Sequence, residues 1–140
     1  MSLAVLYSRA LAGMEARQVT VEVNLSGGLP NFTIVGLPET EVKESKHRVR
    51  AALQNARFEF RARRITVNLA PADLPKESGR FDLPIALGIL AATGQIPGNK
   101  LGEYEFTSEL ALIGELRPIY GPLAMTFRAV KSAQGIYSTV

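Results

Sequence analysis

Residues 71–90 hold the side chains of this 140-residue chain that come nearest to a hydrolytic site. Ser78 lies two residues after Lys76 in a run of turn-forming residues. A serine near a lysine is the pairing of a Ser-Lys nucleophile and base, provided that the lysine is buried enough to lose its proton. Nothing in the local sequence indicates such burial. A peptidase acting through Ser78 is therefore an alternative interpretation rather than the leading one.

Three carboxylates lie in the same segment, at Asp73, Glu77 and Asp82. Paired carboxylates can perform acid-base chemistry. A simpler interpretation fits each position better, because aspartate is common in turns and at the first residues of helices. We therefore expect Asp73 to be a turn residue and Asp82 to cap a helix or complement its dipole.

Other kinds of catalytic site are excluded by what the sequence lacks. There is no cysteine, and His47 is the only histidine, so disulfides, cysteine nucleophiles and histidine-rich metal sites are ruled out. His47 falls in the middle of an expected helix beside Lys46 and Arg48, which does not favour a Ser-His-Asp base. No Gly-rich phosphate-binding loop occurs in the chain, so these residues are not expected to bind ATP or a metal.

Basic residues are concentrated in one window. Residues 43–64 contain eight of the sixteen basic residues and only two acidic ones. Such an imbalance indicates a polyanion such as DNA, or an acidic protein surface, although a solvated helix face is an open alternative. The candidate nucleic-acid-binding residues are Lys43, Lys46, Arg48, Arg50, Arg57, Arg61, Arg63 and Arg64.

The elements that must position these residues follow from periodicity. Apolar residues alternate with polar ones in residues 18–25 and 65–69, which predicts strands. Residues 3–12, 32–35 and 106–113 are also expected to be strands, and those at 3–12 and 18–25 are expected to form a hairpin. Helical spacing predicts helices over 38–57, 81–93 and 121–134. A short strand near 116–120 and another from 136 complete the order. The fold class is therefore α+β, a mixed β-sheet with helices mainly on one face, in one domain spanning 1–140.

The bulk properties fit a globular protein without a membrane anchor. No apolar run is long enough to span a bilayer, and the N-terminal residues lack the pattern of a secretory signal. We expect a cytoplasmic protein. Because the last strand has only begun at Val140, we also expect a fragment of a longer one.

Several motifs resemble those of one bacterial family. The residues that carry the resemblance are the Gly-Leu-Pro-Asn-Phe-Thr-Ile-Val-Gly-Leu-Pro run at 28–38, residues 41–45, 48–52, 65–73, 75–79 and 81–86, and Gly-Glu-Leu-Arg-Pro at 114–118. They are similar to the N-terminus of ComM/YifB-type proteins, which are Mg-chelatase-like AAA+ ATPases associated with competence. The resemblance covers essentially the whole chain.

The resemblance implies a fold and a context. The N-terminal domain of such proteins is Lon-protease-like, in the ribosomal protein S5 domain 2-like class. It implies a following AAA+ module that uses ATP and Mg, and a hexamer that acts on DNA. The expected partners are the chain's own AAA+ module, neighbouring subunits and DNA, with no membrane.

The resemblance also implies where a Lon-type Ser-Lys dyad would stand. Aligning the Lon serine loop with residues 75–82 puts Arg80 at the nucleophile's position, and the Lon lysine falls at Leu123. A guanidinium and an apolar side chain cannot replace that dyad. We therefore expect a non-proteolytic domain, with no catalytic residue, that serves as an assembly or DNA-contact module of an ATPase. The alternatives are an ATP-dependent Lon-type peptidase and an RNA-binding domain of the ribosomal-protein type.

Overall fold

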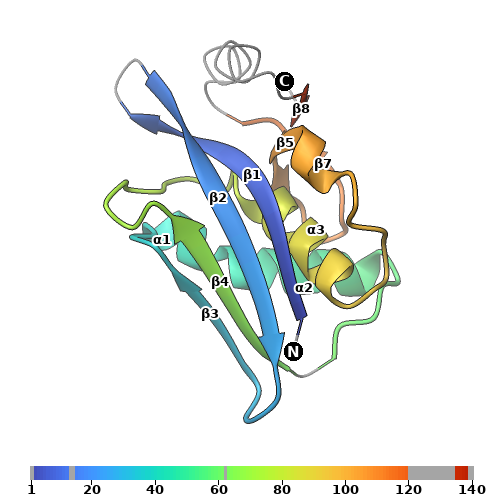
Figure 1. Ribbon diagram of the computed structural model, residues 1–140. Helices are drawn as coiled ribbons and strands as arrows, with labels where there is room; N and C mark the ends of the chain where they lie inside the picture. The colour runs from blue at the N-terminus through green and yellow to red at the C-terminus, as the bar shows by residue number, and fades with distance from the viewer. Residues whose placement is uncertain (1, 13–14, 62, 120–134, 139–140) are drawn as a thin grey trace.

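The computed structural model describes residues 2–12, 15–61, 63–119 and 135–138, and its main feature is one mixed β-sheet (Figure 1). The strands follow the order β3-β4-β2-β1-β5-β8. Their bounds are β1 (Ser2–Ala12), β2 (Glu15–Ser26), β3 (Asn31–Val35), β4 (Arg64–Ala70), β5 (Tyr104–Thr107) and β8 (Gly135–Ser138). A second, two-stranded sheet joins β6 (Glu109–Leu110) to β7 (Leu116–Arg117). The helices are α1 (Thr40–Lys43), α2 (Ser45–Asn55), α3 (Asp82–Ala92) and the 3-10 helix η1 (Leu101–Glu103).

The pairing of the strands makes the sheet mixed. β1 and β2 form an antiparallel hairpin, and β4 continues the antiparallel pattern on the other side of β2. β3 runs parallel to β4, while β5 runs parallel to β1 and β8 parallel to β5. The alternation seen in the sequence appears as alternating burial along β2 and β4. The expected hairpin, the strands near 32–35 and 65–69 and the α+β class are therefore confirmed.

The hydrophobic core lies between the sheet and the two longer helices, which cover the same face (Figure 1). Helix α3 has almost no polar residue and packs on β1 and β2. Its Gly88 allows this close approach, because a Cβ there would lie 2.5 Å from Cγ2 of Val23. The opposite face of the sheet carries half-buried threonine, asparagine and glutamate side chains, at Thr20, Glu22, Asn24, Thr66 and Asn68.

The prediction of one helix over residues 38–57 was wrong in one respect. The structure has two helices there, α1 and α2, which are separated at Glu44. In a continuous helix the carbonyl of Glu41 would accept the backbone N–H of Ser45. Here that carbonyl accepts a hydrogen bond of 2.6 Å from Nη2 of Arg48. The Ser45 hydroxyl is directed at Asp82 instead of solvent. A tertiary contact therefore interrupts a segment with good helical periodicity.

The strand expected over 106–113 was also too long, because it is interrupted at Ser108. Ser108 donates its backbone N–H to the carbonyl of Arg80 at 3.1 Å and accepts the N–H of Leu83 at 3.1 Å. Through these two bonds the backbone of Ser108 pairs with residues at the start of α3 instead of with a neighbouring strand. The helix expected over 121–134 lies outside the described residues. No helix within the described residues is both long enough and apolar enough to span a membrane.

Candidate functional site

The loop before α3 does not form a Ser-Lys dyad. Ser78 Oγ accepts a hydrogen bond of 2.9 Å from Nε of Arg80, which is itself buried. Lys76 directs its ammonium group at the backbone carbonyl of Pro71. A hydroxyl that accepts from a guanidinium is not positioned to give its proton to a base. Ser78 therefore serves as a hydrogen-bond acceptor for Arg80. Leu123, at the position of the Lon lysine, lies outside the described residues.

Lys76 is fully buried, which the sequence did not indicate. Its backbone bridges Leu37 and Glu39, accepting from the N–H of Glu39 and donating to the carbonyl of Leu37. Burial lowers the pKa of the Lys76 ammonium, and the charge of Asp73 opposes this shift. Burial likewise lowers the pKa of Arg80, against the charge of Glu77.

The buried lysine predicts a pH-dependent stability. An unfolded chain holds its lysine proton up to a pKa of about 10.4, and the folded chain releases that proton at lower pH. Between these two values the unfolded state binds more protons, so this residue adds stability as the pH rises through the folded pKa. Replacing Lys76 with methionine should therefore stabilise the protein relative to the wild type most at neutral pH, and progressively less towards pH 10.

Chemical denaturation of the wild type and Lys76→Met across this pH range measures the difference. Lys100→Met serves as the control because Lys100 is exposed. This control shows the effect of replacing an exposed lysine with methionine. A Lys76→Met difference that stayed constant across the pH range would show that the buried ammonium does not titrate as described.

Asp82 is the centre of a buried polar cluster that joins three segments. Its carboxylate accepts the hydroxyl of Ser45, Nε of Arg48 at 2.6 Å, Nη2 of Arg48 at 3.1 Å and the backbone N–H of Leu110 at 3.0 Å. The N-cap residue of α3 is Phe81, and Asp82 lies in the first turn of the helix, where its charge complements the helix dipole as one of the two expectations had it. Its carboxylate is directed towards α2 and β6, so it does not act as the N-cap.

The charges in this cluster stabilise each other. Burial raises the pKa of Asp82, and the hydrogen bonds from Arg48, Ser45 and Leu110 oppose that shift. Burial alone would lower the pKa of Arg48, but the hydrogen bond and charge of Asp82, together with the charges of Glu109 and Glu44, outweigh burial and raise the pKa. Four donors directed at two carboxylate oxygens are the geometry of an ionised aspartate. Arg48, one of the eight candidate nucleic-acid-binding residues, is thus held by Asp82 and is only one-fifth exposed.

Two lysines of the basic window lie beside the outer strand of the sheet. Lys43 and Lys46 line a shallow hollow of about 230 Å³ against residues 31–34 of β3. A second hollow, of about 240 Å³, continues it along Lys46, His47 and Arg50. We call the two hollows together the lysine groove, and its lining residues are Asn31, Phe32, Thr33, Ile34, Lys43, Lys46, His47 and Arg50.

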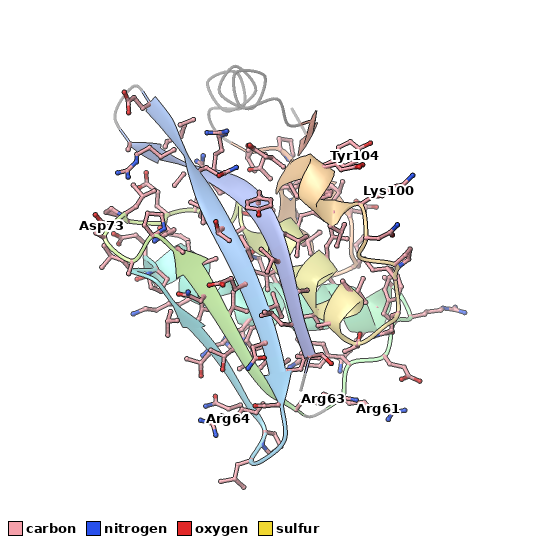
Figure 2. All side chains as sticks on the ribbon, in the orientation of Figure 1. Arg61, Arg63, Arg64, Asp73, Lys100 and Tyr104 are labelled. Atoms are coloured by element: carbon pink, nitrogen blue, oxygen red, sulfur yellow. The ribbon has the colours of Figure 1, made fainter. Side chains whose placement is uncertain are left out.

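Arginines of the basic window lie near Phe60 and at the end of the sheet beside it. The guanidinium carbon of Arg50 lies 5.2 Å from the centroid of the Phe60 ring, which stacks on Phe32 at 6.3 Å. Figure 2 shows Arg61, Arg63 and Arg64 at the same end of the sheet. We call Arg50, Arg61, Arg63 and Arg64 the arginine cluster. Arg50 also lines the lysine groove, so the cluster and the groove are continuous.

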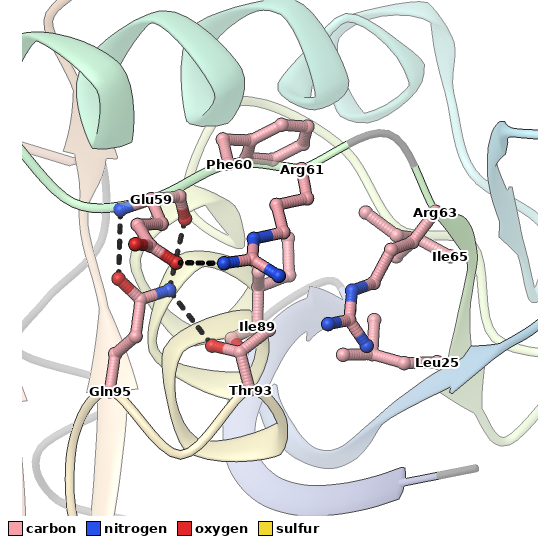
Figure 3. Close-up of a pocket in the computed structure, with 9 residues that line it drawn as sticks. All are labelled: Leu25, Glu59, Phe60, Arg61, Arg63, Ile65, Ile89, Thr93 and Gln95. Carbon is pink, nitrogen blue, oxygen red and sulfur yellow. Dashed lines mark hydrogen bonds and ion pairs between the residues drawn. The ribbon is translucent and has the colours of Figure 1, made fainter.

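A pocket of about 200 Å³ lies within the arginine cluster (Figure 3). Its floor is apolar, from Leu25, Ile65 and Ile89. The guanidinium groups of Arg61 and Arg63 extend over it, as Figure 3 shows. Arg61 forms a 3.4 Å ion pair with Glu59, in which both side chains are about 70% exposed. Such a pair is worth little and leaves the cation available to a ligand.

The wall of this pocket is held by Gln95. Its side-chain amide donates to the carbonyl of Glu59 at 2.9 Å, and its side-chain oxygen accepts the N–H of Glu59 at 2.8 Å. The same amide donates to the Thr93 hydroxyl at 2.9 Å. These bonds tie the segment that carries Phe60 and Arg61 to the end of α3. The remaining member of the basic window, Arg57, is exposed after α2 and lines neither this pocket nor the groove.

Sequence reasoning missed a second buried ion pair. Arg9 on β1 donates to both carboxylate oxygens of Glu105 on β5, at 2.7 and 2.8 Å, and to the carbonyl of Ala16 at 3.0 Å. The two side chains are 2% and 1% exposed. The local sequence carries no signal for this pair, because the residues are 96 positions apart. Among the described residues, no group of three or more histidine, aspartate or glutamate side chains is arranged to hold a metal ion.

Comparison with known proteins places the chain in a family. The family described as subunit ChlI of Mg-chelatase matches residues 21–137. The chain is 60% identical over 132 residues to the competence protein ComM of Haemophilus influenzae, covering 94% of the chain and 26% of ComM. It is 54% identical over 136 residues to YifB of Escherichia coli, covering 97% of the chain and 27% of YifB. An uncharacterized protein of Mycobacterium tuberculosis is 35% identical over 129 residues, which are 92% of the chain and 26% of that protein.

The chain thus spans about a quarter of the length of the relatives that it matches. The match extends across both the polar cluster around Asp82 and the basic window. The chain therefore belongs to the Mg-chelatase-like ComM/YifB family.

Proposed function

We propose that this domain is a non-proteolytic DNA-contact module of a longer Mg-chelatase-like ATPase. One observation carries the proposal: Arg61, Arg63 and Arg64 lie at one end of the sheet, beside a pocket that Arg61 and Arg63 line. Arg50 lies over the ring of Phe60, which lines the same pocket. Guanidinium groups bind phosphates through paired hydrogen bonds, and clustered cations attract a polyanion. The name of the relative ComM, a competence protein, supports a role in handling incoming DNA.

The wider context forms part of the same proposal. An AAA+ module elsewhere in the full-length protein would bind ATP and Mg and assemble the subunits into a hexamer in the cytoplasm. This domain would then bring the arginine cluster to DNA that the ring acts on. The arrangement of Ser78, Arg80 and Lys76 supports a binding role rather than peptide hydrolysis.

A matched pair of double variants tests the DNA contact. Arg63→Gln with Arg64→Gln removes two cations from the arginine cluster. Arg17→Gln with Lys100→Gln removes two exposed cations elsewhere, and Figure 2 shows Lys100 far from the cluster. Each lost phosphate contact should lower the salt dependence of binding by about one unit in the log–log slope. We expect the cluster variant to bind DNA at least about tenfold more weakly at low salt, with a slope smaller by about two units.

Fluorescence anisotropy with labelled single- and double-stranded DNA across a salt series gives both quantities. The control variant should stay close to the wild type. Equal losses in the two variants would mean that only net charge matters, and the arginine cluster would not be a site. Binding that does not change with salt, or no binding at low salt, would end the proposal.

A further inference from the structure

The outer strand β3 presents an open edge. It is first in the strand order, and among the described residues its only strand partner is β4. The N–H of Asn31 donates to the carbonyl of Arg63 at 3.1 Å, so Asn31 directs its backbone towards β4. In a parallel ladder successive residues alternate in direction, which places the N–H and C=O groups of Phe32 and Ile34 on the open side. A strand edge of this kind is a template for another strand.

The lysine groove follows this open edge. Four consecutive residues of β3 form one wall, and Lys43 and Lys46 form the other. Arg50 and His47 extend the basic side towards the arginine cluster. Of the residues that the structure describes, no glutamate or aspartate lines the groove. The groove therefore combines the main-chain groups on the open side of β3 with positively charged side chains. This combination favours an acidic occupant.

Exposed apolar side chains lie at both ends of β3. Leu29 is 86% exposed before the strand, Val35 is 42% exposed at its end, and Leu37 is 52% exposed after it. An added strand would contact these side chains with every second residue of its own. The surface thus matches an extended segment that alternates acidic and apolar residues.

The chemistry of the edge favours a peptide over a nucleic acid. Phe32 and Ile34 offer carbonyl acceptors as well as N–H donors along the same line. A peptide strand can satisfy both, because it also carries both. Phosphate oxygens only accept hydrogen bonds, so they would meet the carbonyls with like partial charge. Nucleic acid is better matched by the guanidinium groups of the arginine cluster.

We propose that β3 accepts an extended acidic peptide segment of a partner protein as an additional strand, with Lys43, Lys46 and Arg50 pairing its carboxylates. This goes beyond the DNA contact and uses Lys43 and Lys46, which are not part of the arginine cluster, while Arg50 belongs to both surfaces. Main-chain hydrogen bonds would supply the affinity, and the cations would select the charge of the segment.

Three short peptides test the proposal on the whole chain. The first alternates glutamate and valine, the second alternates lysine and valine, and the third is the glutamate peptide with alternate backbone nitrogens methylated. We expect the first to bind, the second not to bind, and the third to lose binding because methylation removes the donors of an added strand. Anisotropy of labelled peptides measures the affinities.

Charge reversal provides the matched variants. Lys43→Glu with Lys46→Glu should weaken the glutamate peptide by about tenfold and allow the lysine peptide to bind. Arg17→Glu with Lys100→Glu, which has the same charge change on other exposed surfaces, should do neither. Arg63→Gln with Arg64→Gln should keep the peptide affinity, which separates this site from the DNA contact.

Several outcomes would overturn the inference. Equal binding of the methylated peptide would show attraction by charge alone, without strand addition. Suppose that an oligonucleotide displaces the glutamate peptide and also binds the Lys43→Glu with Lys46→Glu variant more weakly. These two results together would identify the groove as a nucleic-acid site. Absence of binding by the glutamate peptide to the wild type would remove the proposal altogether, and this result does not depend on how any variant folds.

Discussion

Replacing Glu105 with glutamine should lower the free energy of unfolding by about 3–5 kcal/mol, because it removes the carboxylate charge that compensates the guanidinium of Arg9 in the interior. Both side chains are at most 2% exposed, so water cannot take the place of the lost carboxylate. The substitution keeps the shape of the side chain, removes its charge and replaces one of the two oxygens that accept from Arg9 with an amide NH2, which is a donor. The loss is large compared with the total stability of about 5–15 kcal/mol that is usual for a domain.

A double variant distinguishes two contributions to the free energy of unfolding. One is the loss caused by a buried charge without its counter-charge, and the other is the net contribution of the ion pair. Arg9→Met with Glu105→Leu removes both charges and keeps much of the buried volume, so most of the lost stability should return. Urea denaturation of the wild type, Glu105→Gln and the double variant gives the three free energies. If Glu105→Gln cost less than about 1 kcal/mol, the pair would behave like an exposed ion pair, contrary to its burial.

Replacing Asp82 with alanine should lower the free energy of unfolding by about 2–4 kcal/mol, because it removes the acceptor for four hydrogen bonds. The hydroxyl of Ser45 and the N–H of Leu110 would stay buried without that acceptor. Arg48 is one-fifth exposed, so its guanidinium can turn partly to solvent, which keeps the loss below that of Glu105→Gln.

The size of this effect distinguishes two roles for Asp82. A residue that acts only at the start of a helix contributes about 1 kcal/mol, whereas a carboxylate that joins α2, α3 and β6 contributes more. Asp73→Ala is the control, because Asp73 is exposed in the preceding loop and should change stability by less than about 0.5 kcal/mol. Thermal and urea denaturation should rank the two variants in the same order. A loss near 1 kcal/mol for Asp82→Ala would support the capping role instead.

Much of the fold could be predicted from residue patterns. The alternation in β2 and β4 correctly predicted strands, because each strand buries one face. The apolar run of α3 correctly predicted a helix that is buried on nearly all faces. The two errors of element length have tertiary causes. Arg48 occupies the carbonyl of Glu41 and interrupts the first helix, and Ser108 bonds to the start of α3 rather than to the sheet.

The candidate site could be predicted only in part. The concentration of basic residues is visible in the sequence, but the fold divides it into the arginine cluster, the lysine groove and residues outside both. Arg48 illustrates the limit. It looks like any other cation of the window, yet it is paired with Asp82, which lies 34 positions away.

The sequence by itself determined the family, the class of fold and the presence of an uneven charge distribution, because motifs, periodicity and composition are local properties. Only the tertiary structure decided which charges are buried in pairs, that Lys76 is enclosed, and that β3 forms the open edge beside the lysine groove. The physical reason is the same in each instance. Hydrogen bonds and ion pairs depend on distance through space, and strand order depends on pairing between segments that are not consecutive in the chain.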